Sequence, residues 1–76
     1  MKELTQLIVK KLVDKPEEVQ ISVTESESTV ILEISVSKDE LGLVIGKKGR
    51  IINSIRNIMN AVGRKNGKKV IVGIKE

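Results

Sequence analysis

The sequence predicts an α+β domain in which three helices pack on one face of a three-stranded mixed sheet. Three observations lead to this prediction. Apolar residues recur at helical spacing near the start of the chain and again after residue 50. They alternate with polar residues over 19–24 and 30–36, as in half-buried strands, and a last apolar run covers 70–74. Seventy-six residues have room for one core, so we expect a single domain over 1–76.

The first helix is predicted over about residues 2–13, where apolar side chains repeat every three or four positions. The expected core-facing residues are Leu4, Leu7, Ile8 and Leu12. Pro16 cannot continue a helix, because it lacks the backbone N–H and its ring clashes with the preceding turn. The helix is therefore expected to end before Pro16.

The next two apolar segments predict a β-hairpin. The strands over 19–24 and 30–36 are separated by the polar turn at 25–28. The second strand carries an extra apolar residue, Ile31, on its other face. It is therefore expected to be the more buried, central strand of the sheet.

Two helices are predicted between the hairpin and the last strand. A short one over about 38–44 begins with the form of a capping box, with Ser37 as N-cap and Glu40 three residues on. The longest helix begins at about Arg50 and ends between residues 63 and 67. Its apolar residues form a stripe roughly 120° wide. They are Ile51, Ile52, Ile55, Ile58, Met59 and Val62.

The resulting order is helix–strand–strand–helix–helix–strand. A helical crossover between the second and third strands favours their parallel pairing. The hairpin pairs antiparallel, so the sheet is expected to be mixed.

Composition excludes several classes of function. The chain has no Cys and no His, so it lacks thiolate metal ligands and the commonest general base. No run of about 18 apolar residues is present, and the N-terminus has no signal-peptide pattern. We expect no metal, cofactor, small-molecule substrate or membrane span, and a cytoplasmic location.

Charge is unevenly distributed along the chain. Residues 1–39 carry a net charge of −3 and residues 40–76 a net charge of +7. A basic half favours a polyanionic partner. The alternative explanation is a lysine-rich surface that only promotes solubility.

The stretch 46–49, Gly-Lys-Lys-Gly, lies between the two middle helices. Glycines allow a sharp turn and close approach of a ligand to the backbone. The loop opens onto a helix N-terminus, where free N–H groups and the helix dipole favour an anion. Lys47, Lys48 and Arg50 add positive charge, which suits a phosphodiester chain. The alternative is an ordinary turn with two solvated lysines.

The segment 44–52, Val-Ile-Gly-Lys-Lys-Gly-Arg-Ile-Ile, resembles the GxxG signature of KH domains. The α-β-β-α-α-β order resembles the type II arrangement, in which the extra helix and strand precede the signature. Further resemblance over 12–19, 41–42 and 54–56 is to the small stand-alone bacterial KH proteins of the KhpA family. The resemblance covers essentially the whole chain.

This resemblance implies a single-stranded RNA-binding protein, because the KH GxxG loop holds the backbone of about four nucleotides. The implied RNA-binding positions are Ile45, Gly46, Lys47, Lys48, Gly49, Arg50, Ile52 and Arg56. For Arg56 a solvated helix face is the alternative.

The resemblance also implies an apolar groove for the bases. Candidates for its floor are Val44, Ile45 and Ile52, with the central strand around Ile31 and Glu33. A place in the core is the alternative for Ile45 and Ile52.

Members of the resembled family are RNA chaperones that act as homodimers or with a larger KH-containing protein of the KhpB (Jag, EloR) type. Their roles lie in cell elongation, cell shape and peptidoglycan homeostasis. Two alternatives stay open for this chain: a dimerisation module that binds little or no RNA, and a single-stranded DNA binder. Catalysis is not expected, because turns and helix caps account for the carboxylates.

Overall fold

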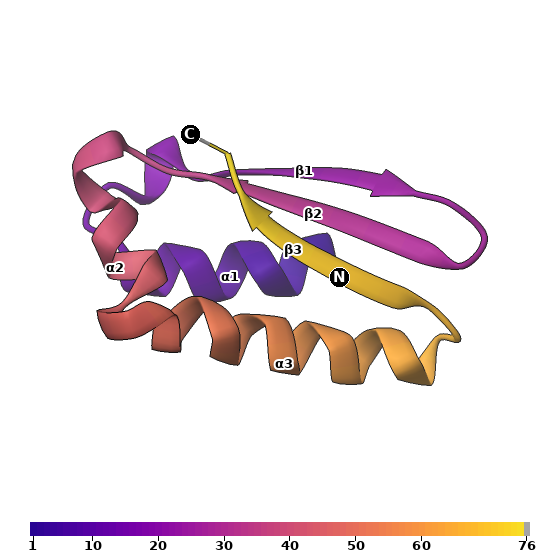
Figure 1. Ribbon diagram of the computed structural model, residues 1–76. Helices are drawn as coiled ribbons and strands as arrows, with labels where there is room; N and C mark the ends of the chain where they lie inside the picture. The colour runs from indigo at the N-terminus through magenta and orange to yellow at the C-terminus, as the bar shows by residue number, and fades with distance from the viewer. Residues whose placement is uncertain (76) are drawn as a thin grey trace.

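The structure, a computed structural model, describes residues 1–75. Its helices and strands are α1 (Lys2–Leu12), β1 (Gln20–Glu25), β2 (Thr29–Ser35), α2 (Leu41–Ile45), α3 (Arg50–Lys65) and β3 (Lys69–Ile74). Within this range, short 3₁₀ turns occupy Pro16–Glu18, Lys38–Glu40 and Lys47–Gly49. The α-β-β-α-α-β order is confirmed, and the helices lie on one side of the sheet (Figure 1).

The sheet is mixed, in the order β1-β2-β3. β1 pairs antiparallel with β2, placing Ile21 opposite Ile34. β3 pairs parallel with β2, placing Ile31 opposite Ile71. The prediction of a central second strand is confirmed, and β3 forms one outer edge of the sheet.

The core lies between the helices and the face of β2 formed by Val30, Leu32 and Ile34, which are at most 1% exposed. Alternation along a strand sends the intervening side chains to the opposite face. Ile31 is 39% exposed and Glu33 is also exposed. The predicted groove floor around these two residues is therefore wrong, because they lie on the sheet face that the helices do not cover.

The buried face of α1 agrees only in part with the predicted one, since Ile8 and Leu12 pack against the core as expected. Thr5 and Val9 are fully buried, whereas Leu4 and Leu7 are 36% and 56% exposed. Thr5 is tolerated in the core because its hydroxyl donates to the carbonyl of Met1 at 2.9 Å. Hydrophobic spacing could not assign a threonine to the core, and so it missed Thr5 and included Leu4 and Leu7, which are exposed.

The predicted capping box is wrong. The Ser37 hydroxyl donates to the Asp39 carboxylate and makes no helix cap. Glu40 is only 4% exposed, and its carboxylate accepts from the backbone N–H groups of Asp14 at 2.7 Å and Lys15 at 3.1 Å. Hydrogen bonds from two N–H groups compensate for burying its charge. Glu40 thus ties the chain after α1 to the beginning of α2.

The end of α3 is a Schellman motif built on Gly67, whose φ is +69°. The Lys68 N–H donates to the Gly63 carbonyl at 2.8 Å, and the Gly67 N–H donates to the Arg64 carbonyl at 3.1 Å. Gly63 itself is helical and buried. A Cβ there would lie 2.7 Å from the Lys68 carbonyl oxygen and would overlap the Val70 side chain. Gly63 therefore sets how closely α3 approaches β3.

Gly63→Ala is expected to destabilise the domain by about 2 kcal/mol, although alanine favours a helix by about 1 kcal/mol. The cause is overlap with backbone, which a side-chain rotation cannot relieve. Urea unfolding followed by circular dichroism measures the loss. Gly42→Ala is the control, because a Cβ on Gly42 meets nothing within 4 Å. Equal stability of the two variants would show that α3 and β3 are not held at this spacing.

Candidate nucleic-acid interface

The loop between α2 and α3 has a backbone that requires its glycines. Gly46 has φ +74° and ψ 172°, a region open essentially to glycine alone. Lys48 and Gly49 are both left-handed, with φ of 57° and 74°. A Cβ on Gly46 would lie 2.7 Å from Cγ1 of Ile51, so the loop packs tightly on the first turn of α3. The sequence-based prediction of a sharp glycine turn is confirmed.

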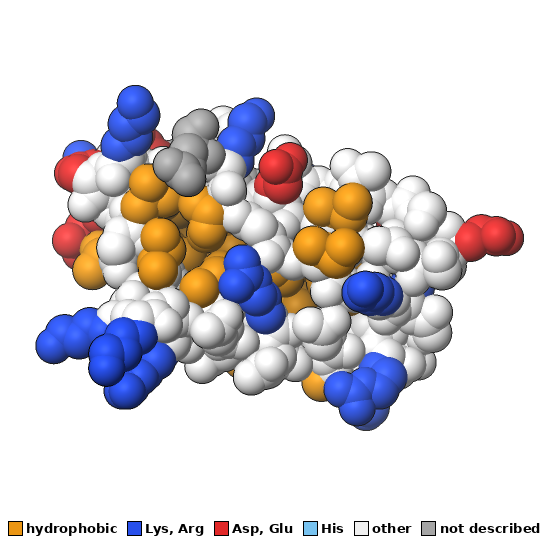
Figure 2. All heavy atoms as spheres, in the orientation of Figure 1, with side chains coloured by type: hydrophobic (Ala, Val, Ile, Leu, Met, Phe, Trp, Pro, Cys, Tyr) orange, Lys and Arg blue, Asp and Glu red, His pale blue; other side chains and the backbone are white. Residues whose placement is uncertain are grey.

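This loop is a basic corner of the molecule. Lys47, Lys48 and Arg50 are exposed, and within residues 1–75 none of them forms a salt bridge. No side chain caps the N-terminus of α3, although the Arg50 N–H donates to the Lys47 carbonyl, and the positive end of the helix dipole lies at this corner. Basic side chains gather at the lower left of Figure 2, where Figure 1 places the loop. The arrangement suits an anion that approaches the backbone.

The structure separates the apolar residues that flank the loop. Val44 and Ile52 are buried, at 0% and 4% exposed, and belong to the core. Ile45 is 37% exposed and Leu43 is 42% exposed. Hydrophobic side chains also border the basic corner in Figure 2. Of the two isoleucines predicted to bind RNA, Ile45 is accessible to a base, and Ile52 supports the loop from beneath.

Arg56 spans from α3 to the outer edge of the sheet. Its Nε donates to the carbonyl of Val72 at 2.9 Å, and its Nη1 donates to Oδ1 of Asn53 at 3.2 Å. Asn60 donates to the Arg56 carbonyl at 2.9 Å. Spacings of three and four residues place Asn53, Arg56, Asn60 and Arg64 in one row along α3. We call this row the α3 polar row, and it faces the edge strand β3.

The outer edge of β3 presents backbone groups to the same side. The Lys69 N–H donates to the carbonyl of Ser28, just before β2, and the Lys75 N–H donates to the carbonyl of Ile34, both at 2.8 Å. In a parallel pair of strands, every second residue directs both its N–H and its C=O group toward the neighbouring strand. Val70, Val72 and Ile74 therefore direct their N–H and C=O groups away from β2. Such donors and acceptors can pair with the edge of an unstacked base.

Sequence reasoning found the loop but missed Asn53, Asn60 and the edge of β3. A helical wheel groups the α3 polar row on one side of the helix, but it cannot show which strand that side faces. The edge position of β3 follows only from the assembled sheet. The side chain of Arg56 is part of this surface, and it is hydrogen-bonded rather than freely solvated.

Among residues 1–75, no group of three His, Cys, Asp or Glu side chains is placed to hold a metal ion. In the same part of the chain, no helix has the length and apolar character needed to cross a membrane.

Comparison with known proteins gives a consistent result over the whole chain. Residues 2–74 match the family described as "KhpA/KhpB, KH domain". The RNA-binding protein KhpA of Clostridium perfringens is 49% identical over 74 residues, which cover 97% of this chain and 99% of the relative. KhpA of Listeria monocytogenes is 49% identical over the full length of both chains, and that of Aquifex aeolicus is 45% identical over all of this chain and 96% of the relative. No solved structure matches the chain significantly.

Proposed function

This chain belongs to the KhpA/KhpB KH-domain family, and from that premise we propose that it binds single-stranded RNA at the loop 46–49. The observation that carries the proposal is the loop itself: a glycine-dependent backbone with three exposed cations at an uncapped helix N-terminus. Relatives that match along the full chain are named RNA-binding proteins. The family is non-enzymatic, and we assign no catalytic residue.

In this mechanism Gly46 and Gly49 let the sugar–phosphate backbone lie against the loop. Lys47, Lys48 and Arg50 neutralise its phosphates, and the positive end of the α3 dipole favours the same oxygens. The bases then point toward Ile45 and the edge of β3. Backbone groups of β3 and the guanidinium of Arg56 supply hydrogen bonds to base edges.

Binding is expected to be weak and only modestly sequence-selective. The chain contains no Phe, Tyr or Trp, so bases cannot stack on aromatic rings. Where it occurs, such stacking contributes about 1–3 kcal/mol per base. A charge-dominated contact of this kind corresponds to a Kd of about 10⁻⁴–10⁻⁶ M at physiological salt.

The test is fluorescence anisotropy of a short unstructured RNA, titrated with the protein at several salt concentrations. Three or four phosphate contacts on a single strand give a log–log salt slope of about −2 to −3. A DNA strand of the same sequence is the control, since we expect RNA to bind more tightly through its 2′-hydroxyls. A slope near zero, or tighter binding of the DNA, would contradict the proposal.

A second copy of the domain raises the apparent affinity for RNA, because two linked weak sites bind one strand with avidity. We therefore include homodimerisation, or pairing with a larger KhpB-like KH protein, in the proposal. Leu4 and Leu7 on α1 are 36% and 56% exposed in the single chain, and so they are available to a second chain. Sedimentation analysis is expected to give twice the mass of one chain, and a monomer at all concentrations would contradict homodimerisation.

The cellular part of the proposal follows from the family alone. A cytoplasmic RNA chaperone and post-transcriptional regulator would act on cell elongation, cell shape and peptidoglycan homeostasis. A protein-interaction module that does not itself bind RNA is the second candidate, because exposed apolar side chains lie on α1, α2 and α3. The RNA titration separates the two, since only the first candidate binds the strand directly.

A further inference from the structure

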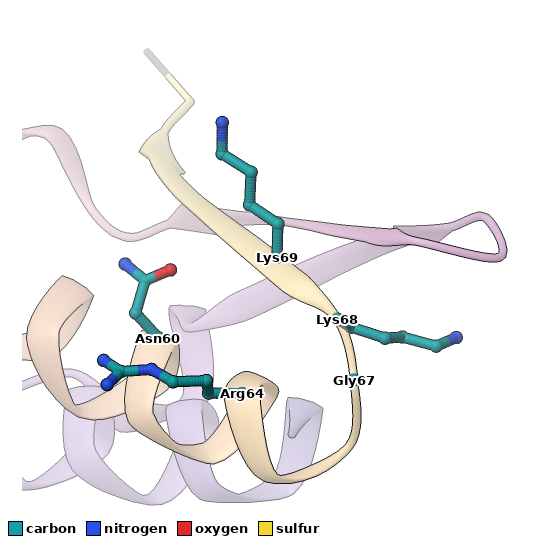
Figure 3. A pocket seen from close by; sticks show the side chains of 5 residues that line it. All are labelled: Asn60, Arg64, Gly67, Lys68 and Lys69. Atoms are coloured by element: carbon teal, nitrogen blue, oxygen red, sulfur yellow. The ribbon is translucent and has the colours of Figure 1, made fainter.

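A second basic feature lies at the opposite end of α3 from the loop 46–49. It is an open crevice of about 310 Å³ between the end of α3 and the beginning of β3. The residues that line it are Asn60, Arg64, Gly67, Lys68 and Lys69. Figure 3 shows Asn60 and Arg64 coming from α3 and Lys69 from β3, with Lys68 extending away from them.

The three cations of the crevice are not equivalent. The Lys68 ammonium pairs with the Glu25 carboxylate and donates to the carbonyl of Ser26, so it ties β3 to the hairpin turn. The hydrogen bond from the Lys68 ammonium lowers the pKa of the Glu25 carboxyl below its ordinary value. Arg64 and Lys69 form no salt bridge within residues 1–75. Two exposed positive charges therefore border the hollow without neutralisation.

A continuous polar path joins this crevice to the loop. The α3 polar row runs from Asn53 to Arg64. Arg56 in its middle donates to the outward carbonyl of Val72, and Asn60 and Arg64 line the crevice together with Lys69. Asn60 belongs to both features, because it lines the crevice and bonds to the Arg56 carbonyl. Fourteen residues separate Arg50 from Arg64, a distance of about 21 Å along the helix. A strand that leaves the loop along this row reaches the crevice.

We infer that the crevice is a second phosphate-binding site for the same strand, with Arg64 and Lys69 as the groups that contact the phosphate. The bound RNA then extends beyond the roughly four nucleotides that a KH loop holds. This inference rests on the proposed function, since the loop supplies the first contact and sets the direction of the strand. Asn60 adds an amide that contacts the sugar or base between the two sites.

The test compares oligouridylates of four and ten nucleotides in anisotropy titrations at low salt. The variant is Arg64→Gln with Lys69→Gln, and the control is Lys10→Gln with Lys11→Gln on α1. Both pairs are exposed and both variants lose two positive charges. The crevice variant is expected to bind the ten-nucleotide RNA about tenfold more weakly and to change four-nucleotide binding less than twofold. Because the crevice variant loses one phosphate contact, the steepness of its log–log salt dependence for the longer RNA is expected to fall by about 0.7.

The control variant is expected to bind both RNAs within twofold of the wild-type protein. Equal weakening for the two lengths, or an equal effect of the control, would show that Arg64 and Lys69 act only as general positive charge and would overturn the inference. Unchanged binding of the longer RNA by the crevice variant would overturn it as well. In each of these cases the proposed binding at the loop is unaffected, provided that the wild-type protein binds both RNAs. A wild-type protein that binds neither RNA overturns both proposals.

Discussion

Replacing Ile55 by aspartate is expected to unfold the domain, whereas the same replacement at Ile58, three residues further along α3, leaves it folded. Ile55 is 2% exposed and lies in the core, but Ile58 is 46% exposed. A carboxylate at position 55 would be buried without a partner, at a cost of several kcal/mol. A chain of this length has a total stability of about 4–11 kcal/mol, so the loss removes most or all of it.

Circular dichroism and thermal melts of the two variants measure this difference. Ile55→Asp is expected to show no cooperative transition, and Ile58→Asp is expected to melt within a few degrees of the wild-type protein. The matched pair excludes a general effect of a new negative charge on the helix. Cooperative melting of Ile55→Asp would show that α3 does not pack through this residue. Unfolding of Ile58→Asp would show that the stability of the fold depends on the exposed side of α3.

Replacing Lys47 and Lys48 together by aspartate is expected to abolish RNA binding while leaving the fold intact. The two side chains lie in solvent between Gly46 and Gly49 and make no salt bridge within residues 1–75. Asp is among the residues that tolerate the left-handed backbone of position 48. Two favourable contacts with phosphates become two repulsive ones, so we expect affinity to fall about 100-fold or more.

The control for this variant is Lys10→Asp with Lys11→Asp, which makes the same change of charge on α1. We expect that control to lose affinity less than threefold, because its charges act on the RNA only at long range. Melting curves of both variants should match that of the wild-type protein. Equal losses of affinity in the two variants would contradict a specific role of the loop. A collapsed melting transition in the loop variant would show that the lysines hold the fold together.

The sequence was sufficient for the order of elements and for the loop. Alternation at β2 and the glycine spacing at 46–49 depend on local rules, and the structure follows both. Glu40 shows where local rules fail. Its sequence position favours a helix cap, but its carboxylate binds backbone N–H groups 25 and 26 residues earlier. A contact between distant segments of this kind leaves no periodic signal in the sequence.

The candidate site was only partly predictable for the same reason. The glycines and lysines of the loop are contiguous, and so their pattern is visible in the sequence. The α3 polar row becomes a possible nucleic-acid surface only because β3 is an edge strand whose outward groups face it. Ile45 and Ile52 could not be separated from hydrophobicity alone, because their difference in burial depends on how α2 packs against α3.

Mapping of amide chemical shifts by NMR shows whether the loop 46–49 holds the RNA backbone. A ten-nucleotide single-stranded RNA is added to ¹⁵N-labelled protein until the shifts stop changing. We expect the largest changes at Gly46, Gly49 and the first turn of α3, smaller changes at Val70 and Val72, and none at Lys10. Largest changes on α1, with the loop amides unmoved, would contradict binding at the loop.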